Sequence, residues 1–91
     1  MQRNSKKNLQ FRKAVGKILA NIRKQNTSTS RSTFAREYDL DRGNLSKTER
    51  GLTGCTLSTA WRITEATGVK FSEFAKMLED ELGEDFKLMD E

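Results

Sequence analysis

The chain has 91 residues, enough for one small domain and too few for two separate hydrophobic cores. It carries 17 basic and 13 acidic residues, a formal net charge of +4 at pH 7. Histidine is absent and Cys55 is the single cysteine, so an intrachain disulfide, the usual zinc sites and histidine-assisted nucleophiles are excluded. No stretch approaches the ~20 apolar residues of a membrane span. This composition favours a small intracellular binding module without a cofactor over an enzyme.

Charge is distributed unevenly along the chain. Residues 1–25 contain eight basic residues and no acidic one, whereas residues 71–91 contain two basic and eight acidic residues. Such a gradient turns one side of a domain toward a polyanion and keeps the other side away from it. On charge alone, an ordinary solvated face and a helix bound to an anionic membrane surface remain open alternatives.

The chain has no proline, so helix ends must be inferred from caps and glycines. Residues 1–8 are polar and predict a flexible basic arm. Residues 9–25 carry apolar side chains at spacings of three and four, which is typical of an amphipathic helix. Four further helices are expected over residues 31–38, 42–50, 57–67 and 73–82, with N-caps at Ser30, Asp41, Thr56 and Ser72. Gly51 suits the left-handed position after the third helix.

Each of the four later helices has an expected inner face. These faces comprise Phe34, Ala35 and Tyr38; Leu45, Thr48 and Glu49; Leu57, Ala60, Ile63, Thr64 and Thr67; and Phe74, Met77, Leu78 and Leu82. Residues 84–91 form an acidic tail that is expected to fray. The sequence therefore predicts an all-α bundle of five short helices over residues 9–83.

Two very short helices joined by a tight turn form a helix-turn-helix pattern. The residues in this pattern and after it are Phe34-Ala35, Leu40-Asp41, Leu45-Ser46, Glu49-Arg50-Gly51, Thr56 with Thr59, Ile63, Gly68-Val69 and Ser72 with Phe74. In this order and spacing the sequence resembles the lambda-repressor/Cro-type helix-turn-helix family, also called the XRE family, over residues 13–78. The resemblance implies a compact lambda-repressor-like bundle that binds DNA, is cytoplasmic and comes from a bacterium or phage.

Several residues depart from the pattern of this family. Arg31 stands where the family commonly has Gln, Asp39 where Gly is frequent, and Cys55 where Pro is frequent. Thr64 and Thr67 replace Ala and Leu, which weakens the core slightly. We expect Arg31 to change the DNA contacts rather than remove them. Cys55 is interpreted as an inert small residue, with a redox switch as the alternative.

The resemblance places four residues of the third helix toward the bases of DNA: Arg42, Gly43, Asn44 and Lys47. Arg42 or Lys47 could bond the O6 and N7 atoms of guanine, and Asn44 could pair with adenine. The alternative for Arg42 and Lys47 is contact with phosphate alone. Gly43 would let the helix approach the bases closely, or it is simply tolerated at an exposed site.

Other residues are candidates for phosphate contacts or for a dimer interface. Arg31, Ser32 and Ser46 are expected over phosphates, flanked by Arg23, Lys24 and Arg50, which could equally be ordinary solvent charges. Family members commonly dimerise near the fifth helix, and the candidate interface residues are Trp61, Phe74, Met77 and Leu78. The alternative for Trp61 is a place in the core.

The leading hypothesis is a sequence-specific transcriptional regulator, a repressor that binds double-stranded DNA as a homodimer on a palindromic operator. A second hypothesis is a protein-interaction module, or an antitoxin-like partner protein, that keeps the helix-turn-helix fold. In either case the acidic tail is a candidate site for a protein partner. The third hypothesis is a role on a membrane surface. It explains the basic first helix but not the capped helices that follow.

Overall fold

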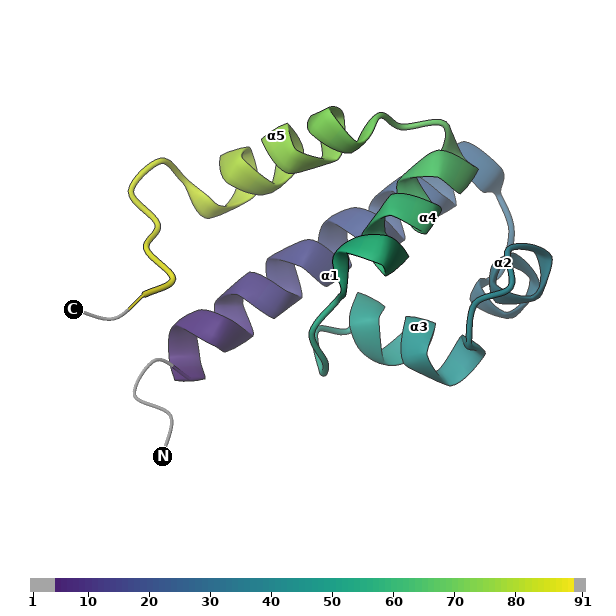
Figure 1. Ribbon diagram of the computed structural model, residues 1–91, viewed down its shortest axis with the longest axis horizontal. Helices are drawn as coiled ribbons and strands as arrows, with labels where there is room; N and C mark the ends of the chain where they lie inside the picture. The colour runs from purple at the N-terminus through teal and green to yellow at the C-terminus, as the bar shows by residue number, and fades with distance from the viewer. Residues whose placement is uncertain (1–4, 90–91) are drawn as a thin grey trace.

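The computed structural model describes residues 5–89, and within them the chain forms five α-helices and no strand (Figure 1). The helices are α1 (Ser5–Thr27), α2 (Arg31–Glu37), α3 (Arg42–Glu49), α4 (Leu57–Thr67) and α5 (Phe71–Leu82). The all-α prediction is confirmed. Because no described helix is both long enough and apolar enough, none of them could cross a bilayer.

The long helix α1 is the central element of the bundle. It packs against α3, α4 and α5, while α2 packs against α3 and α4 against α5 (Figure 1). The core lies along its apolar stripe, where Leu19 and Ile22 meet Phe34, Leu45 and Ile63. Every other helix is therefore positioned, directly or through α3, by contacts with α1.

Helix α1 begins earlier than predicted. Residues 5–8, assigned to a flexible arm, are helical, and residues 1–4 of that arm lie outside the described residues. The segment after α5 folds back beside this end of α1, and the ring of Phe86 stacks on that of Phe11 with 6.3 Å between centroids. This packing gives the first turns of α1 a tertiary partner that apolar periodicity alone does not reveal. Phe86 is thus packed, whereas Met89 is exposed.

Three of the four predicted N-caps are confirmed. The side-chain oxygens of Ser30, Asp41 and Thr56 each accept a hydrogen bond from the backbone N–H three residues later. The prediction of Ser72 as the fourth cap is wrong, because α5 begins at Phe71. There the Glu73 carboxylate accepts a hydrogen bond from the Lys70 N–H at 2.9 Å. This bond satisfies a backbone donor that has no partner within the helix.

The predicted inner faces hold with three exceptions, and the one on α5 is Met77, which is 40% exposed. Leu57 is 76% exposed because it lies in the first turn of α4, at the rim of a groove between α4, α5 and α1. Tyr38 is 39% exposed, since it follows the last turn of α2 and covers only one side of the Phe34 ring, 4.8 Å away. Ala60, Ile63, Thr64 and Thr67 of α4 are buried as expected.

Candidate nucleic-acid interface

The turn between α2 and α3 is held by backbone and side-chain hydrogen bonds. Asp39 adopts φ +57°, in the left-handed region, and the Leu40 N–H then donates to the Ala35 carbonyl at 2.8 Å. Aspartate tolerates this conformation better than most residues, which explains how Asp39 can occupy a position where the helix-turn-helix family frequently has glycine. One residue later Asp41 accepts from the Asn44 N–H at 2.8 Å and starts α3. The turn therefore points the first residues of α3 outward.

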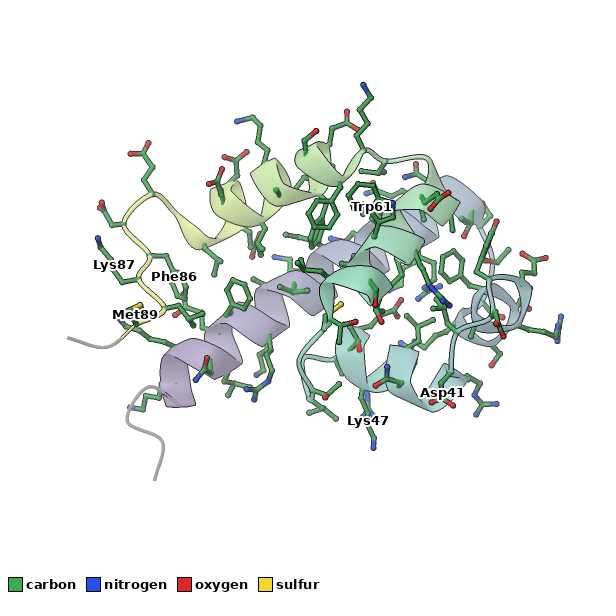
Figure 2. The ribbon with its side chains drawn as sticks, in the orientation of Figure 1. Asp41, Lys47, Trp61, Phe86, Lys87 and Met89 are labelled. Carbon is green, nitrogen blue, oxygen red and sulfur yellow. The ribbon has the colours of Figure 1, made fainter. Side chains whose placement is uncertain are left out.

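Helix α3 is divided sharply into a buried and an exposed side. Leu45 and Thr48 are each 2% exposed and face the bundle. The four base-reading candidates, Arg42, Gly43, Asn44 and Lys47, are all exposed. Figure 2 shows Lys47 projecting from α3 away from the other helices. The structure thus brings these four residues together on one polar surface.

A buried ion-pair network joins α1, α2 and α3. The Glu49 carboxylate accepts from Arg23 through two bonds, Nε to Oε2 at 2.7 Å and Nη2 to Oε1 at 2.9 Å. It also accepts from the Arg31 Nε at 2.8 Å, and Arg31 reaches Ser46 Oγ at 3.3 Å. The third donor group of Arg23 bonds the Thr29 carbonyl at 2.9 Å. One carboxylate thereby ties the start of α2 and the end of α3 to α1.

The position of Arg23 corrects one sequence prediction. Arg23 was a candidate phosphate contact, but it is 4% exposed and each of its three guanidinium nitrogens donates a hydrogen bond within the protein. Sequence reasoning missed this pairing because Arg23 and Glu49 are 26 residues apart. The expectation that Glu49 lies on the inner face of α3 is confirmed, since it is 8% exposed.

The ionisation of Glu49 depends on its two arginines. Burial by itself would raise the pKa of Glu49, but the hydrogen bonds and positive charges of Arg23 and Arg31 outweigh it and lower the pKa below the ordinary 4.5. The carboxylate is therefore charged throughout the neutral range. A charged Glu49 holds Arg31 across the α2–α3 junction.

The remaining phosphate candidates all keep some solvent-exposed surface. Ser32, Lys24 and Arg50 are exposed, Ser46 is partly exposed and the Arg31 side chain is 38% exposed. Hydrogen bonds to Glu49 and Ser46 thus hold one edge of the Arg31 guanidinium, and the rest of the side chain is exposed to solvent. No described interaction occupies the charges of Lys24 or Arg50.

A close approach between α1 and α3 sets the position of α3, and sequence reasoning missed it. A Cβ added at Gly16 would clash with the Thr48 carbonyl oxygen and would lie 2.6 Å from that of Glu49. Glycine is therefore required for α1 and α3 to pack at this distance. The available signal was a glycine in the interior of a long amphipathic helix, where it costs about 1 kcal/mol relative to alanine and so needs a packing reason.

The side of the molecule formed by α4 and α5 exposes apolar side chains. Trp61 (labelled in Figure 2) is 56% exposed and stacks on Phe71 with 5.2 Å between centroids. Met77 is 40% exposed. The prediction of Phe74 as an interface residue is wrong, because it is 4% exposed and packs in the core. Phe71 and the partly buried Leu78 line a groove of about 520 Å³ between α1, α4 and α5.

These features define a class of protein. A short capped turn between two brief helices, with the second helix held rigidly and its polar side exposed, is the architecture of a helix-turn-helix DNA-binding regulator. Across residues 5–89, no group of three or more Cys, Asp or Glu side chains is placed to hold a metal ion.

Comparison with known proteins agrees with this class. The control protein C.MunI of a Mycoplasma species is 33% identical over 66 residues, which cover 72% of this chain and 89% of that protein. The chain therefore belongs to the family of control proteins that includes C.MunI. No family model matches the chain, and no solved structure matches it.

Proposed function

We propose that this protein is a sequence-specific regulator of transcription that places α3 in the major groove of double-stranded DNA. The observation that carries the proposal is the division of α3, whose exposed side consists of Arg42, Gly43, Asn44 and Lys47 while its other side is fixed to α1 and α2. A major groove admits one α-helix, and side chains of this kind complement its base edges. Similarity to a control protein supports a regulatory role.

In this proposal Arg42 and Asn44 read bases, because they lie in the first turn of α3, which enters the groove first. Lys47 reads a base or contacts phosphate from the next turn. Arg31, Ser32, Ser46, Lys24 and Arg50 contact phosphates around the groove and set the orientation of the protein. Arg23 has no part in this contact, since it bonds the buried Glu49 carboxylate, which in turn holds Arg31.

Selection from a random duplex library, followed by titration of the selected duplex, tests the proposal. Asn44→Ala is expected to lose about 1–3 kcal/mol of discrimination at one base pair while random-sequence affinity stays nearly constant. The Asn44 backbone N–H still donates to Asp41 in this variant, so the fold is retained. An equal loss on all duplexes would contradict base reading by Asn44, and enrichment of no sequence would contradict the function.

We further propose that the protein acts as a homodimer and a repressor. The exposed apolar residues Leu57, Trp61 and Met77, together with the adjoining groove, support association through the α4–α5 face. A symmetric dimer would place two copies of α3 about 34 Å apart, one turn of DNA, and the selected duplexes would be palindromic. Repression is tested by transcription from a promoter that carries the selected site, where added protein should reduce the transcript.

A further inference from the structure

Two basic residues of α1 lie against the end of α3, outside the helix-turn-helix. The Arg12 Nε–H donates to the Gly51 carbonyl oxygen, 3.2 Å away, which anchors this part of α1 to the residue after α3. Gly51 has φ +75°, and a Cβ built on it would lie 2.7 Å from Lys13 Cγ and 2.8 Å from Lys13 Cα. The Lys13 side chain therefore leaves α1 directly beside the C-terminal end of α3.

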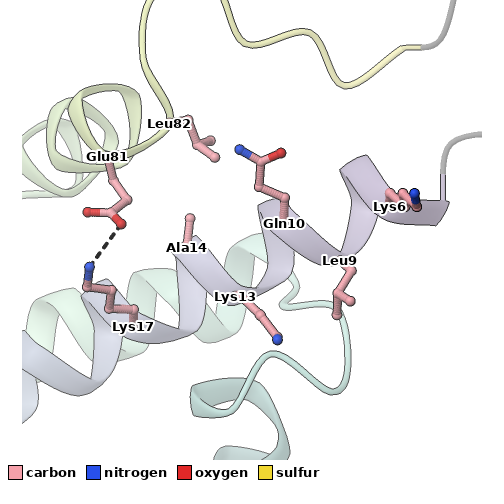
Figure 3. Close-up of a pocket in the computed structure, with 8 residues that line it drawn as sticks. All are labelled: Lys6, Leu9, Gln10, Lys13, Ala14, Lys17, Glu81 and Leu82. Carbon is pink, nitrogen blue, oxygen red and sulfur yellow. Dashed lines mark hydrogen bonds and ion pairs between the residues drawn. The ribbon is translucent and has the colours of Figure 1, made fainter.

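The charge of Lys13 is available to a ligand. Lys13 is exposed, and the ion pairs formed among residues 5–89 do not include it. One turn further along α1, Lys17 instead pairs with Glu81 of α5 at 3.0 Å. Figure 3 shows Lys17 turned toward Glu81, whereas Lys13 points away from α5 and toward the side where α3 joins α4.

The surroundings of Lys13 carry positive charge. Lys47 in the last turn of α3 and Arg50 directly after it are exposed, and residues 51–56 contain no acidic residue. The positive surface of α3 therefore continues onto α1 without an intervening carboxylate. Double-stranded DNA carries a negative charge every ~1.7 Å of its axis, so a duplex bound by α3 also presents phosphates beyond the end of that helix.

We propose that Lys13, with Arg12 anchoring its segment, is an additional contact to the DNA backbone. The protein then binds phosphates from α1 as well as from the helix-turn-helix, and its contact extends past the C-terminal end of α3. This inference rests on the proposed function, because it requires that α3 face the duplex. Lysine suits the role, since it acts on phosphate as a flexible point charge.

The test compares Lys13→Gln with the matched control Lys17→Gln in titrations of a random-sequence duplex and the selected duplex over a series of salt concentrations. Lys13→Gln is expected to weaken binding about 3- to 10-fold on both duplexes and to reduce the salt slope by about 0.9, the value for one phosphate contact. Lys17→Gln should change neither quantity, because the Lys17 charge is paired with Glu81. Lys13→Arg should restore the slope.

Glutamine keeps the Cγ atom that lies close to Gly51, so equal thermal unfolding of Lys13→Gln and wild type is expected. An unchanged affinity and slope in Lys13→Gln would overturn the inference and leave the proposed function standing. A loss confined to the selected duplex would also overturn it, since that would indicate base reading. Altered sedimentation with unaltered DNA binding would assign Lys13 to a protein contact instead. A wild-type protein that binds no duplex would contradict the proposed function itself.

Discussion

The two ends of the bundle are held together by different interactions. At the helix-turn-helix end, the Glu49 carboxylate bonds Arg23 and Arg31 at 2.7–2.9 Å and connects three helices. At the α4–α5 end, aromatic rings contact each other at centroid distances of 5.2–5.5 Å and leave apolar surface uncovered. Charge-assisted bonds have strict geometry, whereas ring contacts tolerate small shifts. The end that faces DNA in our proposal is thus fixed in orientation, and the other end offers an adaptable surface for association.

The largest effect should come from the carboxylate that joins the three helices. Glu49→Gln keeps the shape of the side chain but leaves the buried Arg23 without a countercharge, and it should lower the free energy of unfolding by about 3–5 kcal/mol. Urea denaturation would measure this loss. Glu65→Gln, at an exposed position of α4, is the matched control and should change stability by less than about 0.5 kcal/mol. Equal stability of the two variants would mean that the network does not hold this end together.

A slightly smaller effect is expected where α1 and α3 touch. Gly16→Ala places a methyl group against the carbonyl oxygens of Thr48 and Glu49, and it should cost about 2–3 kcal/mol as the helices move apart. Gly43→Ala is the control, because its Cβ would meet only Asp41 Oδ2 at 3.5 Å. That variant should gain up to about 1 kcal/mol from its higher helix propensity. If both substitutions stabilise the protein, the close approach does not exist in solution.

Acid should weaken the helix-turn-helix end, though less than the substitution of Glu49. The pKa of Glu49 is lowered in the folded protein, so the stability that the carboxylate contributes is fully present above about pH 4.5 and is lost as the pH falls through the lower folded value. Urea midpoints measured from neutral pH downward would show this loss. In Glu49→Gln the same acid range should have a smaller effect, and an identical pH profile would rule out Glu49 as the titrating group.

The smallest effect on stability is expected at the α4–α5 end. Trp61→Thr removes a half-exposed ring and its stack on Phe71, and it should cost about 1 kcal/mol. The same change should abolish self-association if Trp61 lies in a dimer interface, which analytical ultracentrifugation would detect. A dimer that persists in Trp61→Thr would move the interface elsewhere on the molecule.

Local sequence signals predicted most of the fold. Oxygen-bearing caps at Ser30, Asp41 and Thr56, together with the left-handed Gly51, marked helix ends because these signals act within three residues. The missed cap of α5 shows the limit of such signals. Serine is a better capping residue than lysine, yet α5 begins at Phe71, one residue before Ser72. The Phe71 ring at this start packs between the rings of Trp61 and Phe74.

The site was predictable only in part, because some of its contacts join segments that are far apart in the sequence. The position of Arg42, Asn44 and Lys47 on α3 follows from helical spacing after the Asp41 cap, and the structure places all three at the surface. The burial of Arg23 depends on a carboxylate in a distant segment. The need for Gly16 likewise depends on the backbone of α3. Contacts of this kind arise only when the helices are assembled in space.

The exposed side of α3 has a practical consequence. Within the described chain the fold uses the backbone of Arg42, Asn44 and Lys47, as in the bond from the Asn44 N–H to Asp41, but no hydrogen bond or ion pair of their side chains. These positions can therefore be exchanged without disturbing the supporting framework. A combinatorial collection of variants at these three positions would offer a route to retargeted DNA-binding proteins with the melting temperature of the parent.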